Sequence, residues 1–174
     1  MGAGKLRLMR IEIVRGDITR VSADAIVNAA NESLAGGGGV DGAIHLAAGP
    51  KLAEAGRKLV PCEVGDAKAT PAFDLSPQIK WVIHTVGPRW SGGGANEAEQ
   101  LASCYRRSLE VAGELGASTI AFPAISTGIF GYPLDEACDV AVTVLRATPT
   151  QVEKVLLMAF DDRNFEALSR ALES

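Results

Sequence analysis

The sequence of 174 residues has few cysteines, two histidines and no long apolar run. Three widely spaced cysteines, Cys62, Cys104 and Cys138, do not form a disulfide framework, and they predict a reducing, cytoplasmic location. The two histidines lie far apart and give no metal-ligand spacing, so we expect no metal. No apolar segment approaches the ~20 residues of a membrane span. Residues 1–10 lack the apolar core of a signal peptide, so we expect no membrane contact.

An excess of basic charge is also missing. Lysine and arginine number 17 against 21 acidic residues, which gives a net charge of −4. This balance argues against a nucleic-acid partner, because affinity for a phosphate backbone comes from clustered basic side chains. The length and the 47% hydrophobic content fit a single domain over residues 1–174. Residues 1–5 carry no fold signal, and we expect them to be a disordered start or a remnant of cloning.

Strand and helix patterns alternate along the chain. Short apolar runs predict strands, and longer segments with apolar residues at helical spacing predict helices. The expected strands span residues 6–14, 25–28, 66–71, 81–86, 119–122 and 155–160. The expected helices span residues 40–49, 51–60, 97–116, 134–146 and 164–172. The alternation predicts an α/β sandwich, with helices on both faces of a largely parallel sheet and ligands beyond the carboxyl ends of its strands.

A glycine loop with one carboxylate separates the second expected strand from the next helix. After Asn28 and Asn31 come four consecutive glycines at residues 36–39, and Asp41 follows as the helix begins. Glycines at a helix start let backbone N–H groups approach an anion. Asp41 would repel that anion, so it is better placed to handle a water or hydroxyl beside a phosphate. The pattern predicts a diphosphate cradle with a reactive carboxylate.

The sequence supports three other interpretations of this loop less well. A glycine run can be a flexible linker, but an apolar strand and an amphipathic helix flank this one. Gly37, Gly39 and Gly42 match the G-x-G-x-x-G spacing of dinucleotide-binding folds. In those folds the glycines follow the strand at once, whereas here residues 28–35 intervene. The sequence has no G-x-x-x-x-G-K-[ST] motif of P-loop NTPases.

A second glycine-punctuated loop spans residues 123–133 and carries the hydroxyls of Ser126 and Thr127. Such hydroxyls and N–H groups suit phosphate oxygens. A nucleophile elbow at Ser126 is disfavoured because its hydrolase fold needs a later histidine, whereas His45 and His84 both precede Ser126. The bulky Phe130 has little structural reason to lie in this loop, which suggests a ligand contact.

Four further side chains have open interpretations. Asp17 could cap the segment after the first strand, or accept a hydrogen bond from an exocyclic amine such as that of adenine. Phe160, at the end of the last strand, fits a core position or stacking on a base. His84, inside an apolar strand, is typical of a hydrogen-bonded core histidine. His45, one turn after Asp41, fits a structural role better than a catalytic one.

The motifs occur in order over nearly the whole chain. They are Gly-Asp-Ile-Thr at 16–19, Asp-Ala-Ile-Val-Asn-Ala-Ala-Asn at 24–31, Gly-Gly-Gly-Gly-Val-Asp-Gly-Ala-Ile-His at 36–45, Val-Ile-His-Thr-Val-Gly-Pro at 82–88 and Pro-Ala-Ile-Ser-Thr-Gly-Ile-Phe-Gly-Tyr-Pro at 123–133. Together they resemble a macro domain of the MacroD type. The resemblance implies a three-layer α/β/α sandwich, with a mixed, mostly parallel sheet of about six strands, and an ADP-ribose cleft.

The resemblance also implies which residues line that cleft. Asp17 and Ile18 would hold the adenine, with Phe160 against it. The diphosphate would be wrapped by Ser126, Thr127, Gly128, Ile129 and Phe130. The distal ribose would lie near Gly38, Gly39 and Val40, with Asn31 on its hydroxyls. One departure is Leu46, where the family often has arginine.

In the family, the residues matching Asn31 and Asp41 are linked to hydrolysis of O-acetyl-ADP-ribose and of mono-ADP-ribosylated acidic side chains. The resemblance therefore implies a metal-independent hydrolase without a cofactor, acting as a monomer on ADP-ribose derivatives and mono-ADP-ribosylated proteins. Asp41 would orient the attacking water. Either Asp41 or a substrate phosphate would take its proton. The alternatives are an ADP-ribose-binding reader without turnover and, against the net charge, an RNA-associated module.

Overall fold

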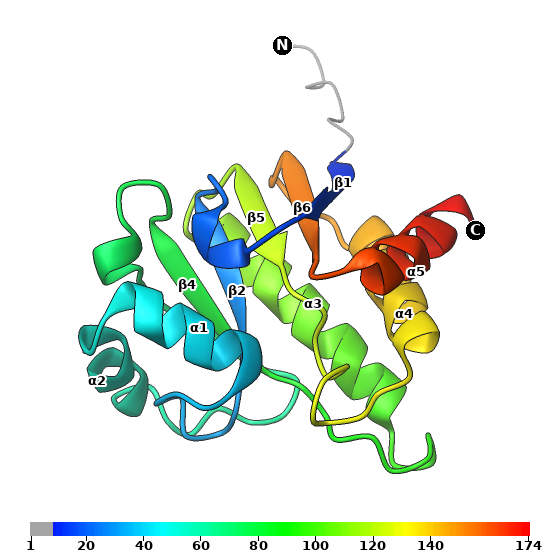
Figure 1. The fold of residues 1–174 in the computed structure, drawn as a ribbon, viewed down its shortest axis with the longest axis horizontal. Helices are drawn as coiled ribbons and strands as arrows, with labels where there is room; N and C mark the ends of the chain where they lie inside the picture. Colours follow the sequence, from blue (N-terminus) through cyan, green and yellow to red (C-terminus); the bar gives the residue numbers. More distant parts are fainter. Residues whose placement is uncertain (1–8) are drawn as a thin grey trace.

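The computed structural model describes residues 9–174, which form a six-stranded sheet in the order β1-β6-β5-β2-β4-β3 (Figure 1). The strands are β1 Arg10–Arg15, β2 Ala25–Ala30, β3 Ala67–Pro71, β4 Trp81–Val86, β5 Thr119–Phe122 and β6 Lys154–Ala159. Neighbouring strands run parallel, except that β3 is antiparallel to β4. The predicted mixed, mostly parallel sheet is confirmed.

Helices cover both faces of this sheet (Figure 1). They are α1 Gly39–Ala48, α2 Lys51–Arg57, α3 Glu97–Glu114, α4 Leu134–Ala147 and α5 Asp162–Glu173, with single 3₁₀ turns η1 Ile18–Arg20 and η2 Phe73–Leu75. One apolar cluster joins the sheet to α1 and α2, and a second joins it to α3, α4 and α5. The three-layer sandwich expected from the sequence is therefore confirmed.

The alternation of side chains along each strand explains why both faces are apolar. In β2, Ile26 packs in the cluster under α1, and its neighbour Val27 packs in the cluster under α3. Leu156 and Leu157 divide in the same way in β6. Burying a side chain of this size stabilises the fold by about 1.5–3 kcal/mol. A strand that is buried on both faces has a continuous apolar sequence, which is why these strands could be predicted from the sequence.

The structure differs from the sequence expectation at several element ends. Strand β2 continues two residues beyond Asn28, because its backbone stays paired with β4 as far as Ala30 opposite Val86. Helix α2 ends at Arg57 rather than at residue 60. The expectations for residues 1–5, and for a strand at residues 6–8, lie outside the described residues. Over residues 9–174, no helix has the length and apolar character needed to span a membrane.

Candidate functional site

Both glycine loops lie at the carboxyl edge of the sheet. The first, residues 31–38, joins β2 to α1, and the second, residues 123–133, joins β5 to α4. Because β2 and β5 are parallel neighbours, their carboxyl ends meet at the same edge (Figure 1). Asn31 of the first loop and Phe130 of the second line the same cavity, so the two loops lie close together at this edge.

Asp41 is a buried carboxylate beside the first loop. It lies in the first turn of α1, with a relative exposure of 4%, and Asn28 Nδ2 donates a hydrogen bond of 2.8 Å to its Oδ1 atom. His45 Nε2 lies 3.4 Å from the same oxygen, one helical turn away. Burial raises the pKa of Asp41 above its usual 3.8, and the Asn28 hydrogen bond and His45 offset part of that rise. A raised pKa makes the carboxylate a stronger base.

A series of buried, hydrogen-bonded side chains connects Asp41 to the interior of the sheet. The second N–H of Asn28 points at His84 Nδ1, 3.1 Å away, and His84 Nε2 lies 3.0 Å from Thr70 Oγ1. Burial, together with nearby His45, lowers the pKa of His84 to about 4, so its ring is neutral at neutral pH. The hydrogen bonds fit a tautomer in which Nδ1 accepts from Asn28 and Nε2–H donates to Thr70. The expectation of a hydrogen-bonded core histidine is confirmed.

Gly37 passes directly over the two polar side chains of the first loop. A Cβ atom at this position would lie 2.9 Å from Asp41 Oδ2 and 3.0 Å from Asn31 Nδ2. Gly42 is equally confined, since its Cβ would approach Gly37 O to 2.6 Å. The backbone can therefore lie close to Asp41 only because both positions are glycine.

The side chain of Asn31 forms most of its hydrogen bonds within the first loop. Its Oδ1 atom accepts hydrogen bonds from Ser33 N at 3.0 Å and from Ser33 Oγ at 2.5 Å. Its Nδ2 atom donates to Gly36 O at 3.0 Å. One N–H of the amide is left for a ligand, so Asn31 shapes the first loop as well as facing the cleft.

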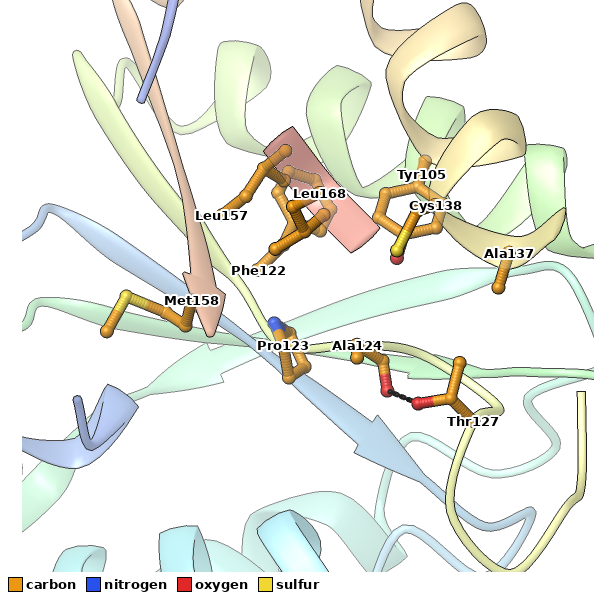
Figure 2. Close-up of a pocket in the computed structure, with 10 residues that line it drawn as sticks. All are labelled: Tyr105, Phe122, Pro123, Ala124, Thr127, Ala137, Cys138, Leu157, Met158 and Leu168. Atoms are coloured by element: carbon orange, nitrogen blue, oxygen red, sulfur yellow. Dashed lines mark hydrogen bonds between the residues drawn. The ribbon is translucent and has the colours of Figure 1, made fainter. Parts of the chain in front are cut away.

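The second loop holds one strained and unpartnered serine. Ser126 has a φ of 66°, is 7% exposed, and its Oγ atom has no hydrogen-bond partner among the described residues. Gly87 lies so close that a Cβ there would clash with Ser126 Oγ. Thr127 Oγ1 donates to Ala124 O at 3.3 Å, which closes the turn (Figure 2). A buried hydroxyl without a hydrogen-bond partner is uncommon in folded proteins, so Ser126 is an unusual feature of this loop.

The cavity beneath this loop is too small for a ligand. It measures about 10 Å³ and lies between the sheet and α4, lined by residues that include Tyr105 and Cys138 (Figure 2). This volume is at the lower limit for one water molecule. It is a packing defect of the core below the site.

Phe130 is held in place by the segment that follows β4. The guanidinium of Arg89 lies over its ring, with Cζ 4.6 Å from the centroid, and Trp90 N donates to Phe130 O at 2.8 Å. The buried Glu97 organises this segment by accepting from Ser91 N, Gly93 N and Ala95 N at 2.7 to 3.0 Å. These bonds, with Ser91 contributing most, lower the pKa of Glu97 to about 2.

The residues expected at the adenine end gather at β1 and β6, which are neighbours in the sheet. Asp17 Oδ1 accepts hydrogen bonds from Thr19 Oγ1 at 2.7 Å and from Thr19 N at 2.9 Å. The second bond caps η1, and both bonds, the side-chain one most, lower the pKa of Asp17. Ile18 is buried in the cluster under α1, so its backbone is the part that remains for a ligand. Phe160 is 89% exposed, so its interpretation as a core residue is wrong.

Four side chains with structural contacts near the candidate site were not predicted from the sequence: Asn28 as the partner of Asp41, Thr70, Arg89 and Glu97. An asparagine inside an otherwise apolar strand was the one signal that could have identified the buried chain. No comparable signal marks Arg89 or Glu97, because their roles depend on a loop that returns to the second glycine loop. Over residues 9–174, no three His, Cys, Asp or Glu side chains gather as a metal site would require.

The comparison with known families identifies the fold. A family model described as Macro domain matches residues 27–141. The chain belongs to the macro domain family. A macro domain-containing protein of Chlorobaculum tepidum is 54% identical over 165 residues, covering 93% of this chain and 95% of that relative. A macro domain-containing protein of Lactiplantibacillus plantarum is 49% identical over 169 residues, covering 95% and 97%.

Solved macro domain structures match this one closely. The macrodomain of Oceanobacillus iheyensis with ADP has a TM-score of 0.88 and 40% identity, covering 94% of this chain and 90% of that chain. The Trypanosoma brucei macrodomain in complex with ADP-ribose has a TM-score of 0.84 and 34% identity, covering 94% and 69%. The macro domain described here shares their α/β fold with its mixed six-stranded sheet.

Proposed function

We propose that this macro domain binds ADP-ribose and hydrolyses esters on its distal ribose. The substrates would be O-acetyl-ADP-ribose and proteins mono-ADP-ribosylated on acidic side chains. The observation that carries the proposal is the buried, hydrogen-bonded carboxylate of Asp41 at the first glycine loop. Structural neighbours that hold ADP and ADP-ribose support the ligand class.

The burial of Asp41 favours an enzyme over a reader. Burying a carboxylate costs stability unless its charge is compensated. Among the described residues, its one hydrogen bond comes from the neutral amide of Asn28. A module that only binds a diphosphate gains nothing from a negative charge beside it. A hydrolase does gain from that charge, because its reaction needs a base or a group that orients water.

In the proposed complex the ligand runs along the carboxyl edge of the sheet. The adenine lies at Asp17, the backbone of Ile18 and the exposed ring of Phe160. The diphosphate meets the second loop, where Ser126 Oγ lacks a partner, together with Thr127, Gly128, Ile129 and Phe130. The distal ribose lies at Asn31, Gly38, Gly39 and Val40, next to Asp41.

The reaction follows from this placement. Asp41 and a phosphate oxygen of the substrate orient one water, whose oxygen attacks the ester carbonyl carbon. The bond between that carbon and the ribose oxygen breaks. One water proton passes to Asp41 or to the substrate phosphate, and the ribose oxygen leaves as a hydroxyl after taking up a proton. The products are a carboxylic acid and ADP-ribose.

Turnover of O-acetyl-ADP-ribose in excess chelator tests the proposal. We expect hydrolysis to continue undiminished, because the described residues include no cluster of metal ligands. Binding of ADP-ribose without any release of acetate would identify a reader instead. Activity that is lost in chelator and restored by one divalent ion would contradict the proposed chemistry.

We also propose a cytoplasmic monomer. All three cysteines are free and buried, as in proteins of reducing compartments. The proposed cleft takes every residue from one chain, so no second subunit is needed to complete it. Light scattering of the purified protein at micromolar concentration tests the monomer.

A further inference from the structure

A second cavity, of about 700 Å³, lies beside the proposed ribose site. It shares Asn31 and Phe130 with that site. Its other walls include Glu32 and Ser33 of the first loop, Val64 before β3, Arg89 after β4 and Gln100 of α3. Pockets for drug-sized ligands span about 300–1,000 Å³, so this volume is far more than a two-carbon acetyl group needs.

The sheet order gives the direction in which this cavity extends. The proposed adenine contacts follow β1 and β6, the second loop follows β5, and Asn31 follows β2. The cavity continues past β2 to residues at the end of β4. Strand β4 is the next strand in the sheet after β2 (Figure 1). It therefore extends the line of the ligand beyond the distal ribose. A group esterified to that ribose would project into it.

The cavity walls carry unused polar groups beside apolar ones. Arg89 is exposed and makes no ion pair with any other described residue, and its guanidinium lies over Phe130. The side chain of Gln100 is half-buried, and it forms no hydrogen bond within residues 9–174. Val64 contributes an exposed apolar surface. The exposed carboxylate of Glu32 lies on the wall formed by the first loop. A cation, a carboxylate, an amide and an aliphatic surface together suit a polypeptide better than a small acyl group.

We propose that this cavity binds the polypeptide segment that flanks an ADP-ribosylated aspartate or glutamate, and that Arg89 pairs with a second carboxylate of that segment. This inference rests on the proposed function, because it assumes ADP-ribose in the neighbouring cleft. It assigns mono-ADP-ribosylated polypeptides with an adjacent acidic residue as the preferred substrates over O-acetyl-ADP-ribose.

Calorimetry with a non-hydrolysable ligand tests the inference without turnover. The probe is a peptide that carries ADP-ribose through an amide link, with aspartate on both sides of the modified residue, and it is compared with ADP-ribose alone. We expect the peptide to bind at least ~10-fold more tightly, equivalent to about 1.4 kcal/mol. A protein that binds but does not hydrolyse would still give this difference, so failure of the hydrolase proposal is distinguishable.

Filling the cavity should remove that preference. Gln100→Trp should bring the peptide and ADP-ribose to equal affinity and leave the Kd for ADP-ribose within about two-fold. Val64→Trp fills the cavity from another wall. It replaces Gln100→Trp in this test if Gln100→Trp lowers the Tm. The matched control is Gln151→Trp. Gln151 is exposed and precedes β6, at the amino ends of the parallel strands and away from the cavity at their carboxyl ends, so this variant should change neither Kd.

Arg89→Gln tests the charge pairing. It should weaken the aspartate-flanked peptide to the affinity of a serine-flanked one, because the cation that would pair with a carboxylate is gone. Equal binding of peptide and ADP-ribose by the parent protein would overturn the proposal. A peptide preference that survives both filling variants would do the same. Loss of ADP-ribose binding in both filling variants would assign the cavity to ADP-ribose itself.

Discussion

Asp41 can be removed in two ways that separate catalysis from packing. Asp41→Asn keeps an acceptor for the N–H of Asn28, whereas Asp41→Ala leaves that buried donor unpaired at a cost of about 1–3 kcal/mol. We expect both variants to lose turnover by ~100-fold or more, the scale of a positioned acid or base. Only Asp41→Ala should lower the Tm. Assays with O-acetyl-ADP-ribose and thermal melts measure the two effects.

ADP-ribose affinity is the control for this pair. Both variants should bind ADP-ribose at least as tightly as the parent, because a negative charge near the phosphates has been removed. If Asp41→Asn hydrolysed the substrate within a few-fold of the parent, Asp41 would not be the water-orienting group. The substrate phosphate and Asn31 would then be the remaining candidates.

The raised pKa of Asp41 predicts a pH dependence of stability. Because the folded state disfavours the ionised carboxylate, its contribution is most favourable below 3.8, and it is lost as the pH rises through the raised pKa. Asp41→Asn has no such titration. Its Tm should therefore exceed that of the parent by more at about pH 7 than at about pH 4. A difference that is the same at both pH values would show that Asp41 is not perturbed.

Single residues differ in how far the sequence predicts them. The place of Asp41 in the first turn of α1 was predictable, because a helical pattern begins directly after the four glycines. Phe160 was ambiguous, since an aromatic at a strand end can turn inward or outward, and only the packing shows its 89% exposure. The bond between Asn28 and Asp41 was not predictable, because the two residues are brought together by the path of the first loop.

At the scale of the loop, Gly37 and Gly38 form a matched pair. Gly37→Ala would press a methyl group against Asp41 and Asn31, and we expect a loss of about 1–3 kcal/mol in stability, as for other overpacked positions. Gly38→Ala meets no atom within 4 Å and has an extended backbone with a φ of −96°. Its Tm should match that of the parent. Equal melting temperatures for both variants would show that the backbone of the first loop can shift to accommodate the added methyl group without loss of stability.

The elements themselves followed from apolar periodicity, but their ends did not. Glycine and proline marked most helix boundaries, whereas β2 ran past Asn28 because the sheet, and not the local sequence, satisfies its backbone. The segment at residues 89–96 had no periodic signal. Its shape comes from Glu97, whose carboxylate gathers three backbone N–H groups from the preceding turn.

At the scale of the molecule, the residues proposed to line the cleft follow four neighbouring strands, β1, β6, β5 and β2. ADP-ribose should use its whole length, whereas AMP reaches only the adenine end and the first phosphate. We expect micromolar binding of ADP-ribose, about −8 kcal/mol, and much weaker binding of AMP. Calorimetry that gave equal affinities would remove the argument for a diphosphate cradle between the two loops.

The overall architecture was predictable because strands and helices alternate and each buried strand is apolar on both faces. The position of the antiparallel β3 at the sheet edge was not, since pairing order depends on contacts between distant segments. The same holds for the cavity beside β4. It is formed by five separate segments, at residues 31–33, 64, 86–89, 100 and 130, which only the fold brings together.

The buried chain from Asp41 to Thr70 also restricts how the protein exchanges protons with solvent. Asn28, His84 and Thr70 are each at most 3% exposed, and the amide of Asn28 cannot pass a proton onward. A proton taken up by Asp41 therefore has no exit through the sheet. It must leave through the proposed cleft or past His45 on the helix side.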